Sequence, residues 1–271
     1  MLGDINRSDK SKRIINILII IASILVIIAF TMLIIQFISR KNSDSLLNST
    51  TTTTTITTTA TTTTSAEVEP PSVADKDAAD MSYFDDAVFI GDSISVGYSA
   101  YGFIDEKSVL ASQGMNIEKI NTEKIKSEQN GNYIVLDHLI NLKPAKAYIM
   151  LGSNGIAWLS SEFMIGEYDN FVKSVKEALP DATVYIVSVP PVTIDLESGD
   201  NPITNIMIDD FNSDLEEMAN QNGVHYLDLA SELKDDDDCL FEEYAEKDGM
   251  HFKYAAYEKS LDFFLRHTAD E

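Results

Sequence analysis

The chain has 271 residues, of which 44% are hydrophobic and 24% charged, a composition typical of a folded protein rather than a disordered one. Its formal net charge is −24, so phosphate backbones should repel it and nucleic acid is a poor candidate partner. The single cysteine, Cys239, excludes an intrachain disulfide and a metal site built from cysteines, and we expect it to be a small buried side chain.

The N-terminal region predicts attachment to a membrane. Residues 1–13 form a basic tail, and residues 14–38 are an almost unbroken apolar run. About 25 helical residues extend roughly 37 Å, enough to cross a hydrocarbon core of about 30 Å. A cleavable signal peptide is the alternative, but its apolar region is usually only about 7–15 residues long. We therefore predict one transmembrane signal-anchor helix over residues 14–38, with a cytoplasmic tail before it and the rest of the chain outside the cell.

Residues 39–80 are rich in threonine and other polar side chains. Because such a segment has little apolar surface to bury, it cannot offset its ordering entropy. We predict a disordered linker over residues 39–80, a candidate for O-glycosylation, which holds a domain of residues 81–271 away from the membrane.

Within residues 81–271, short apolar runs alternate with amphipathic stretches. This alternation of strands and helices indicates a three-layer α/β/α sandwich with a mostly parallel central sheet. The predicted strands cover residues 87–90, 108–112, 147–151, 183–189 and 224–227. The predicted helices cover residues 133–142, 161–179, 206–220 and 253–267.

A serine–histidine–aspartate arrangement is the strongest candidate for catalytic chemistry. In parallel α/β sheets, functional groups gather at the carboxyl ends of strands, and Ser93 follows the strand predicted over residues 87–90. A serine nucleophile needs a base, and the base needs an orienting group. His251 lies three residues after Asp248, so one short segment can supply both.

Four short blocks, in the expected order, resemble the SGNH hydrolases, also called the GDSL esterase/lipase family. The resemblance spans residues 86–251, nearly all of the predicted domain. It implies a flavodoxin-like central sheet and a serine hydrolase that works through an acyl-serine intermediate, without a metal or a cofactor. The blocks are Gly91-Asp-Ser-Ile-Ser95, Gly114 within Ser112-Gln-Gly-Met115, Gly152-Ser-Asn154 and Asp248-Gly-Met-His251.

The resemblance also implies individual roles. Ser93 is expected to be the nucleophile, His251 the base, and Asp248 the partner of that base. The oxyanion hole is expected to comprise the Ser93 amide, the Gly114 amide and the Asn154 side chain, since preorganised donors stabilise a tetrahedral intermediate. We expect the glycine at position 114 to let the backbone approach the substrate closely.

The third block departs from the family pattern. The family usually has an aspartate directly after the asparagine, whereas this chain has Gly155 after Asn154. Since that aspartate usually supports the loop, we expect Asn154 to be held less firmly here.

Several residues near these blocks have more than one interpretation. Ser93 alone would also suit a helix N-cap, while we expect Asp92 to cap the turn and order the loop. Trp158, Ile94 and Met250 are candidates for a substrate pocket, although core packing is an equal alternative for Trp158.

Other polar residues are expected to have structural or surface roles. His138 and His225 are interpreted as structural or surface histidines. The four consecutive aspartates at residues 235–238 lack the alternating ligands of a calcium loop, so we expect a solvated acidic turn.

Together these features predict an extracytoplasmic serine esterase that cleaves an ester, foremost the O-acetyl groups of a carbohydrate or cell-wall glycan. Two alternatives remain open at this point: a glycan O-acetyltransferase with the same triad, and a non-catalytic glycan-binding module at the cell surface. The expected partners are a small-molecule or glycan ester and, through the N-terminal helix, the membrane. Nothing in the sequence defines an oligomeric state.

Overall fold

The computed structural model describes residues 73–269. The predicted tail, transmembrane helix and most of the predicted linker therefore lie outside the described residues. Among the helices of residues 73–269, none has the length and apolar character of a membrane span.

The centre of the fold is a sheet of five parallel strands, in the order β2-β1-β5-β6-β7. Numbered along the chain within this sheet, the order is 2-1-3-4-5, which is the flavodoxin-like arrangement. The predicted fold class is confirmed. The strands are β1 (Ala87–Gly91), β2 (Val109–Ala111), β5 (Lys146–Met150), β6 (Thr183–Val187) and β7 (His225–Leu227).

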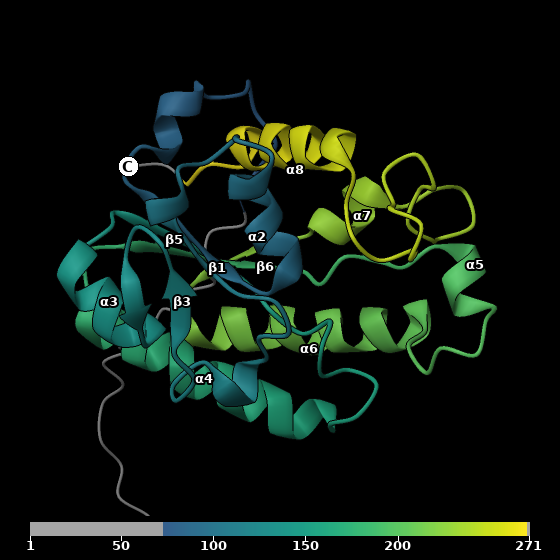
Figure 1. Ribbon diagram of the computed structural model, residues 1–271, viewed down its shortest axis with the longest axis horizontal. Coiled ribbons are helices and arrows are strands. Elements are labelled where there is room, and N and C mark those ends of the chain that lie inside the picture. Colours follow the sequence, from purple (N-terminus) through teal and green to yellow (C-terminus); the bar gives the residue numbers. More distant parts are fainter. Residues whose placement is uncertain (1–72, 270–271) are drawn as a thin grey trace, which may run out of the picture. The chain divides into compact units, whose positions relative to one another are not determined.

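Helices cover both faces of the sheet (Figure 1). One face is covered by α3 (Val135–Leu142), α4 (Ser161–Ala178) and α6 (Asn205–Asn222), and the other by α2 (Ser93–Ala100), α7 (Leu229–Leu233) and α8 (Tyr254–Arg266). The short helix α5 (Ile194–Glu197) follows β6. Strand β1 contributes to both cores because its side chains alternate: Val88 and Ile90 pack in one, Phe89 in the other.

A small antiparallel hairpin, which the sequence did not predict, lies between β2 and α3 in the chain. It consists of β3 (Ile125–Ser127) and β4 (Gly131–Tyr133). Because Tyr133 pairs with Ile125 in this hairpin, the helix expected from residue 133 begins only at Val135. Three 3₁₀ turns were also not predicted: Met81–Phe84, Glu106–Ser108 and Ile117–Lys119.

The folded domain begins before residue 81. The amides of Lys76 and Ala79 donate hydrogen bonds to the carbonyls of Arg266 and Leu265, at the end of α8. Residues 73–80 were expected to belong to the linker of residues 39–80, and for these residues that boundary is wrong. The reason is that the last carbonyls of a helix lack intrahelical partners, and this segment provides donors for two of them.

Candidate active site

The turn from β1 into α2 is held by Asp92. Its Oδ1 atom accepts a hydrogen bond from the amide of Ile94 at 3.0 Å, so Asp92 is the N-cap of α2, as expected. Ser93 is the first residue of the helix, and its hydroxyl bonds to His251 Nε2 instead of capping the helix. The interpretation of Ser93 as a mere N-cap is therefore wrong.

The structure brings Ser93, His251 and Asp248 together. The distance from Ser93 Oγ to His251 Nε2 is 2.8 Å, and that from His251 Nδ1 to Asp248 Oδ2 is 2.7 Å. Partial burial alone would raise the pKa of Asp248, but the amides of His251 and Met250 and the imidazole outweigh it and lower that pKa. Asp248 is therefore ionised and accepts a hydrogen bond from Nδ1–H, which leaves Nε2 free to accept a hydrogen bond from the Ser93 hydroxyl.

The segment that carries the histidine is fixed by its own backbone. Asp248 Oδ1 accepts hydrogen bonds from the amides of Met250 at 3.0 Å and His251 at 2.9 Å. The Thr193 amide, in the loop after β6, donates to the Gly249 carbonyl at 2.9 Å. The aspartate therefore both shapes the turn and orients the imidazole. The contact with Thr193 could not be found from the sequence, because no local pattern links the two segments.

Gly114 lies in a turn at the carboxyl end of β2. The Met115 amide donates to the Ser112 carbonyl at 3.2 Å, and Gly114 has a φ of +73°. A side-chain carbon at this position would meet nothing within 4 Å, so the glycine is required by its backbone conformation. The protein around Gly114 is open, and the close approach of its backbone to a substrate stays a prediction.

Asn154 follows β5, and its side chain reaches two neighbouring segments. Its Nδ2 atom donates to Met115 O at 3.1 Å and to Asp92 Oδ2 at 3.3 Å. Although Gly155 follows it, the Asn154 side chain is held in place, since it bridges two other loops of the site. An ester oxygen can receive a hydrogen bond from Nδ2 only if the amide releases or shares one of these acceptors.

The position after the asparagine has no room for a side chain. A side-chain carbon on Gly155 would lie 2.7 Å from Met164 Cε and 3.1 Å from Asn116 Nδ2. Asn116 and Met164 are both buried. The space that the family's aspartate would need is thus already filled, which explains the glycine.

Asp92 is a buried carboxyl within this set of loops, with an exposed fraction of only 2%. Burial raises its pKa to about 6, although the amide of Ile94 and the nearby His251 act in the opposite direction. Its link to Asn154 was not predicted from the sequence, where the two residues lie 62 positions apart.

The three candidate pocket residues lie in different environments. Ile94 is buried in the core beneath α2, on the same helical face as Tyr98, and so does not line a substrate pocket. Met250 is partly buried against the opposite core. Trp158 is 76% exposed, which rules out core packing and leaves its contact with a substrate as a prediction.

The other singled-out residues lie away from the triad. His138 stacks on Tyr133, with ring centroids 4.2 Å apart, and His225 lies in β7. Cys239 is buried as expected, and the aspartates around it form a turn held by Asp235 Oδ1. Within residues 73–269 no group of three or more histidine, cysteine or carboxylate side chains could hold a metal ion.

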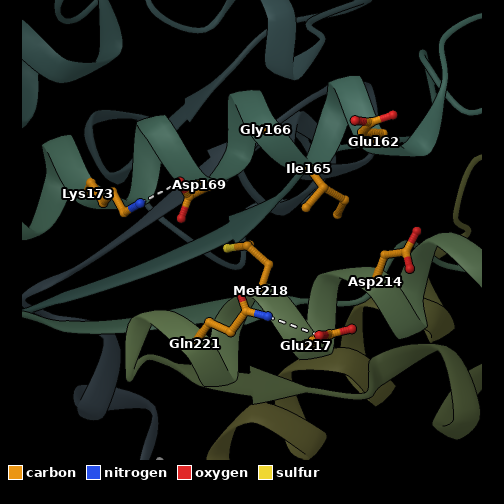
Figure 2. Close-up of a pocket in the computed structure, with 9 residues that line it drawn as sticks. All are labelled: Glu162, Ile165, Gly166, Asp169, Lys173, Asp214, Glu217, Met218 and Gln221. Atoms are coloured by element: carbon orange, nitrogen blue, oxygen red, sulfur yellow. Dashed lines mark hydrogen bonds and ion pairs between the residues drawn. The ribbon is translucent and has the colours of Figure 1, made fainter. Parts of the chain in front are cut away.

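A separate hollow lies between α4 and α6, with a volume of about 510 Å³ (Figure 2). Its polar groups largely pair with one another: Lys173 binds Asp169 at 2.6 Å, and Gln221 binds Glu217 at 3.0 Å. None of its lining residues is a histidine or a cysteine, so it offers no nucleophile with a base beside it. The chemistry of the domain is therefore concentrated at the ends of the strands.

Comparison with known proteins identifies the same region. The family model of the GDSL-like lipase/acylhydrolases matches residues 89–259. No curated protein sequence matches the chain significantly.

Solved structures show the same fold. A GDSL-like lipase from Bacteroides thetaiotaomicron is 18% identical, with a TM-score of 0.51, over 66% of this chain and 84% of that one. A candidate acylhydrolase from Bacteroides fragilis is 19% identical, with a TM-score of 0.51, over 73% of this chain and 89% of that one. A candidate platelet activating factor from Streptococcus pneumonia is 22% identical, with a TM-score of 0.53, over 66% of this chain and 83% of that one.

Proposed function

Because the chain belongs to the GDSL-like lipase/acylhydrolase family and is an ester-hydrolysing enzyme, we propose that it removes O-acetyl groups from a carbohydrate or cell-wall glycan. The observation that carries the catalytic assignment is the continuous contact from Ser93 through His251 to Asp248, at 2.8 and 2.7 Å. We assign Ser93 as nucleophile, His251 as general base and Asp248 as the group that orients the base.

The reaction has two balanced steps. Ser93 Oγ attacks the ester carbonyl carbon while His251 Nε2 takes the hydroxyl proton. The tetrahedral intermediate collapses, and His251 returns the proton to the sugar oxygen, which leaves as an alcohol. Water then attacks the acetyl-Ser93 ester with His251 again as base, and acetate and free Ser93 are produced.

Three donors are assigned to the negative oxygen of the intermediate: the amides of Ser93 and Gly114 and the side chain of Asn154. The Ser93 amide lies at the N-terminus of α2, where the first amides of a helix lack intrahelical acceptors. Donors of this kind are each worth about 10²–10³ in rate.

The substrate class rests on location and charge. The basic tail and apolar run of residues 1–38 favour a domain that faces the outside of the cell, where cell-wall and extracellular glycans are the first substrates it meets. The net charge of −24 disfavours anionic lipid headgroups as substrates. A neutral acetylated glycan fits both the expected location and the negative charge of the chain.

The test uses the full chain in detergent, with three readouts: hydrolysis of p-nitrophenyl acetate, labelling by a fluorophosphonate probe, and acetate release from an O-acetylated xylo-oligosaccharide. Ser93→Ala should abolish all three, while Ser95→Ala, in the same block, should keep them. Hydrolysis of p-nitrophenyl acetate without acetate release from the glycan would refute the substrate class. Transfer of acetyl to a second sugar in preference to water would identify an O-acetyltransferase instead.

A further inference from the structure

A groove beside the nucleophile is formed by α2, the edge strand β2 and the β3–β4 hairpin. Its volume is about 370 Å³, within the range of small-molecule sites. The hairpin is tied to the segment before β2 by two hydrogen bonds: Ser127 Oγ to Glu106 Oε1 at 2.9 Å, and Asn130 Nδ2 to Lys107 O at 3.3 Å. The hairpin therefore forms a fixed wall of the groove.

Residues close in sequence to Ser93 and Gly114 line the groove. Val96, in its wall, is three residues after Ser93 on α2, so the two side chains lie on neighbouring parts of one helical face. Ser112 and Gln113, on the opposite side, directly precede Gly114. A molecule with an ester at Ser93 can thus extend into this groove.

A tyrosine in the wall of the groove has a buried hydroxyl without a hydrogen-bond partner of normal geometry. Tyr133 lines the groove and is 7% exposed, and its hydroxyl has no hydrogen-bond partner of normal geometry. Burial raises the pKa of Tyr133 to about 12; the side chain of Asn130 acts against this, and Glu106 adds to it. The hydroxyl therefore stays protonated. Buried polar groups are nearly always satisfied. Because the hydroxyl has almost no accessible surface, a hydroxyl-bearing ligand can supply the missing partner only when the Tyr133 side chain turns toward the groove.

The walls of the groove match a sugar better than an acyl chain. Val96, Val109 and Ile125 provide apolar surface, while Glu106 and Lys126 bring one charge of each sign. A hydrocarbon chain in this groove would lie beside Glu106 and Lys126 without offering either of them a hydrogen bond. Since these charges balance, and since the chain as a whole is strongly acidic, the ligand that fits is polar and uncharged.

We propose that this groove is the subsite for the sugar units that carry the ester, and that it accepts an uncharged oligosaccharide. This proposal rests on the proposed function, because it requires a glycan as the alcohol part of the substrate. The hairpin would then be a specificity element: it contacts sugar units beyond the reacting ester and takes no part in the bond cleavage itself.

The experiment compares two substrates in the full chain: an O-acetylated xylo-oligosaccharide, which reaches into the groove, and p-nitrophenyl acetate, which is too short to fill it. The quantity measured is the ratio of their kcat/KM values, which does not depend on the fraction of folded enzyme. Tyr133→Phe removes only the hydroxyl, and we expect the ratio to fall about fivefold. Ala100→Trp, at the exposed end of α2 in the groove, should lower it by about tenfold or more.

Two control variants make the same kinds of change elsewhere. Tyr254→Phe alters an exposed tyrosine of α8, and Gly166→Trp places a bulky side chain in the hollow between α4 and α6. Both should keep the wild-type ratio.

The outcomes separate the two proposals. If the wild type releases acetate from the oligosaccharide but neither groove variant changes the ratio, the groove proposal is wrong and the proposed function stands. If the groove variants instead lower activity on p-nitrophenyl octanoate relative to the acetate ester, the groove binds an acyl chain and the sugar assignment is overturned. If the wild type releases no acetate from the oligosaccharide, the substrate class fails and the groove proposal falls with it.

Discussion

The side-chain amide of Asn154 donates a hydrogen bond to the buried carboxyl of Asp92, with 3.3 Å between Nδ2 and Oδ2. The other oxygen of Asp92 accepts from the amide of Ile94 and caps α2. One carboxyl thus joins the loop after β5 to the start of the helix that carries Ser93. Because both bonds share this group, the positions of the nucleophile and of a proposed oxyanion donor depend on each other.

The first prediction concerns Asn154. Asn154→Ala removes a proposed oxyanion donor, so kcat for p-nitrophenyl acetate should fall by about 10²-fold with a smaller change in KM. Asn141→Ala is the matched control, since Asn141 is an exposed asparagine of α3. Equal kcat values for the Asn154 variant and the wild type would exclude the side chain from the oxyanion hole.

The second prediction concerns the charge of Asp248. Asp248→Asn keeps an acceptor for the turn but removes the charge that stabilises a protonated His251, so kcat should fall by about tenfold to 10³-fold. The side chains of His251 and Asp248 are 40% and 54% exposed, and solvent screening places the effect below that of a fully buried pair. The control is Asp80→Asn, which alters another aspartate that caps a short turn, away from the site. A change smaller than twofold at position 248 would contradict the assigned role.

The third prediction separates backbone strain from catalysis. Gly114 and Gly102 have φ values of +73° and +80°, and an alanine side chain would meet nothing within 4 Å at either position. Each glycine-to-alanine change should therefore lower the free energy of unfolding by a similar amount, about 1–2 kcal/mol. Only Gly114→Ala should also lower kcat markedly, because only there is the displaced amide a proposed oxyanion donor. Parallel urea titrations and kinetics of both variants test this, and equal kcat values would remove Gly114 from the oxyanion hole.

The fourth prediction concerns the glycine in the third block. Gly155→Ala places a methyl group against the buried Met164, and should lower the free energy of unfolding by about 1–3 kcal/mol. The loss should be smaller when the same change is made in a Met164→Ala background, since the clash is then removed. Gly166→Ala, in an open position of α4, should instead raise stability by up to about 1 kcal/mol. Equal losses at position 155 in both backgrounds would show that Met164 is not the obstacle.

The fifth prediction concerns pH. The pKa of Asp92 rises from an ordinary value of 3.8 to about 6 in the folded protein, so between these values the folded state binds more protons than the unfolded state. Stability from this group is therefore present at low pH and is lost as the pH rises through about 6, by roughly 3 kcal/mol in total. Asp92→Asn lacks this titration.

Urea unfolding at pH 4, 5, 6 and 7 tests the prediction. The free energy of unfolding of the wild type, relative to that of Asp92→Asn, should decrease across this range. Asp80→Asn is the control, because the pKa of the exposed Asp80 is lowered and the trend should be absent or opposite in sign. A constant difference between wild type and Asp92→Asn would show that Asp92 is ionised throughout.

The sequence by itself determined the fold class and pointed to the three residues of the proposed triad, which the structure brings into contact. Short apolar runs such as residues 87–90 and 147–151 indicate strands without any information from distant residues. The observed strands and helices accordingly lie close to the predicted ranges. Ser93 and the Asp248–His251 segment could be recognised because each belongs to a short contiguous sequence block. The predicted membrane anchor of residues 14–38 lies outside the described residues and stays a prediction.

Tertiary structure decided the contacts that join distant segments. Sequence periodicity does not show that Asp92 holds Asn154, that Thr193 supports the histidine turn, or that the β3–β4 hairpin forms a groove beside α2. It also could not show why position 155 is glycine, since the obstacle is the side chain of Met164 on a different element. The physical reason is the same in each case: such interactions depend on which side chains the packed sheet and helices bring within a few ångströms, and no local propensity encodes that distance.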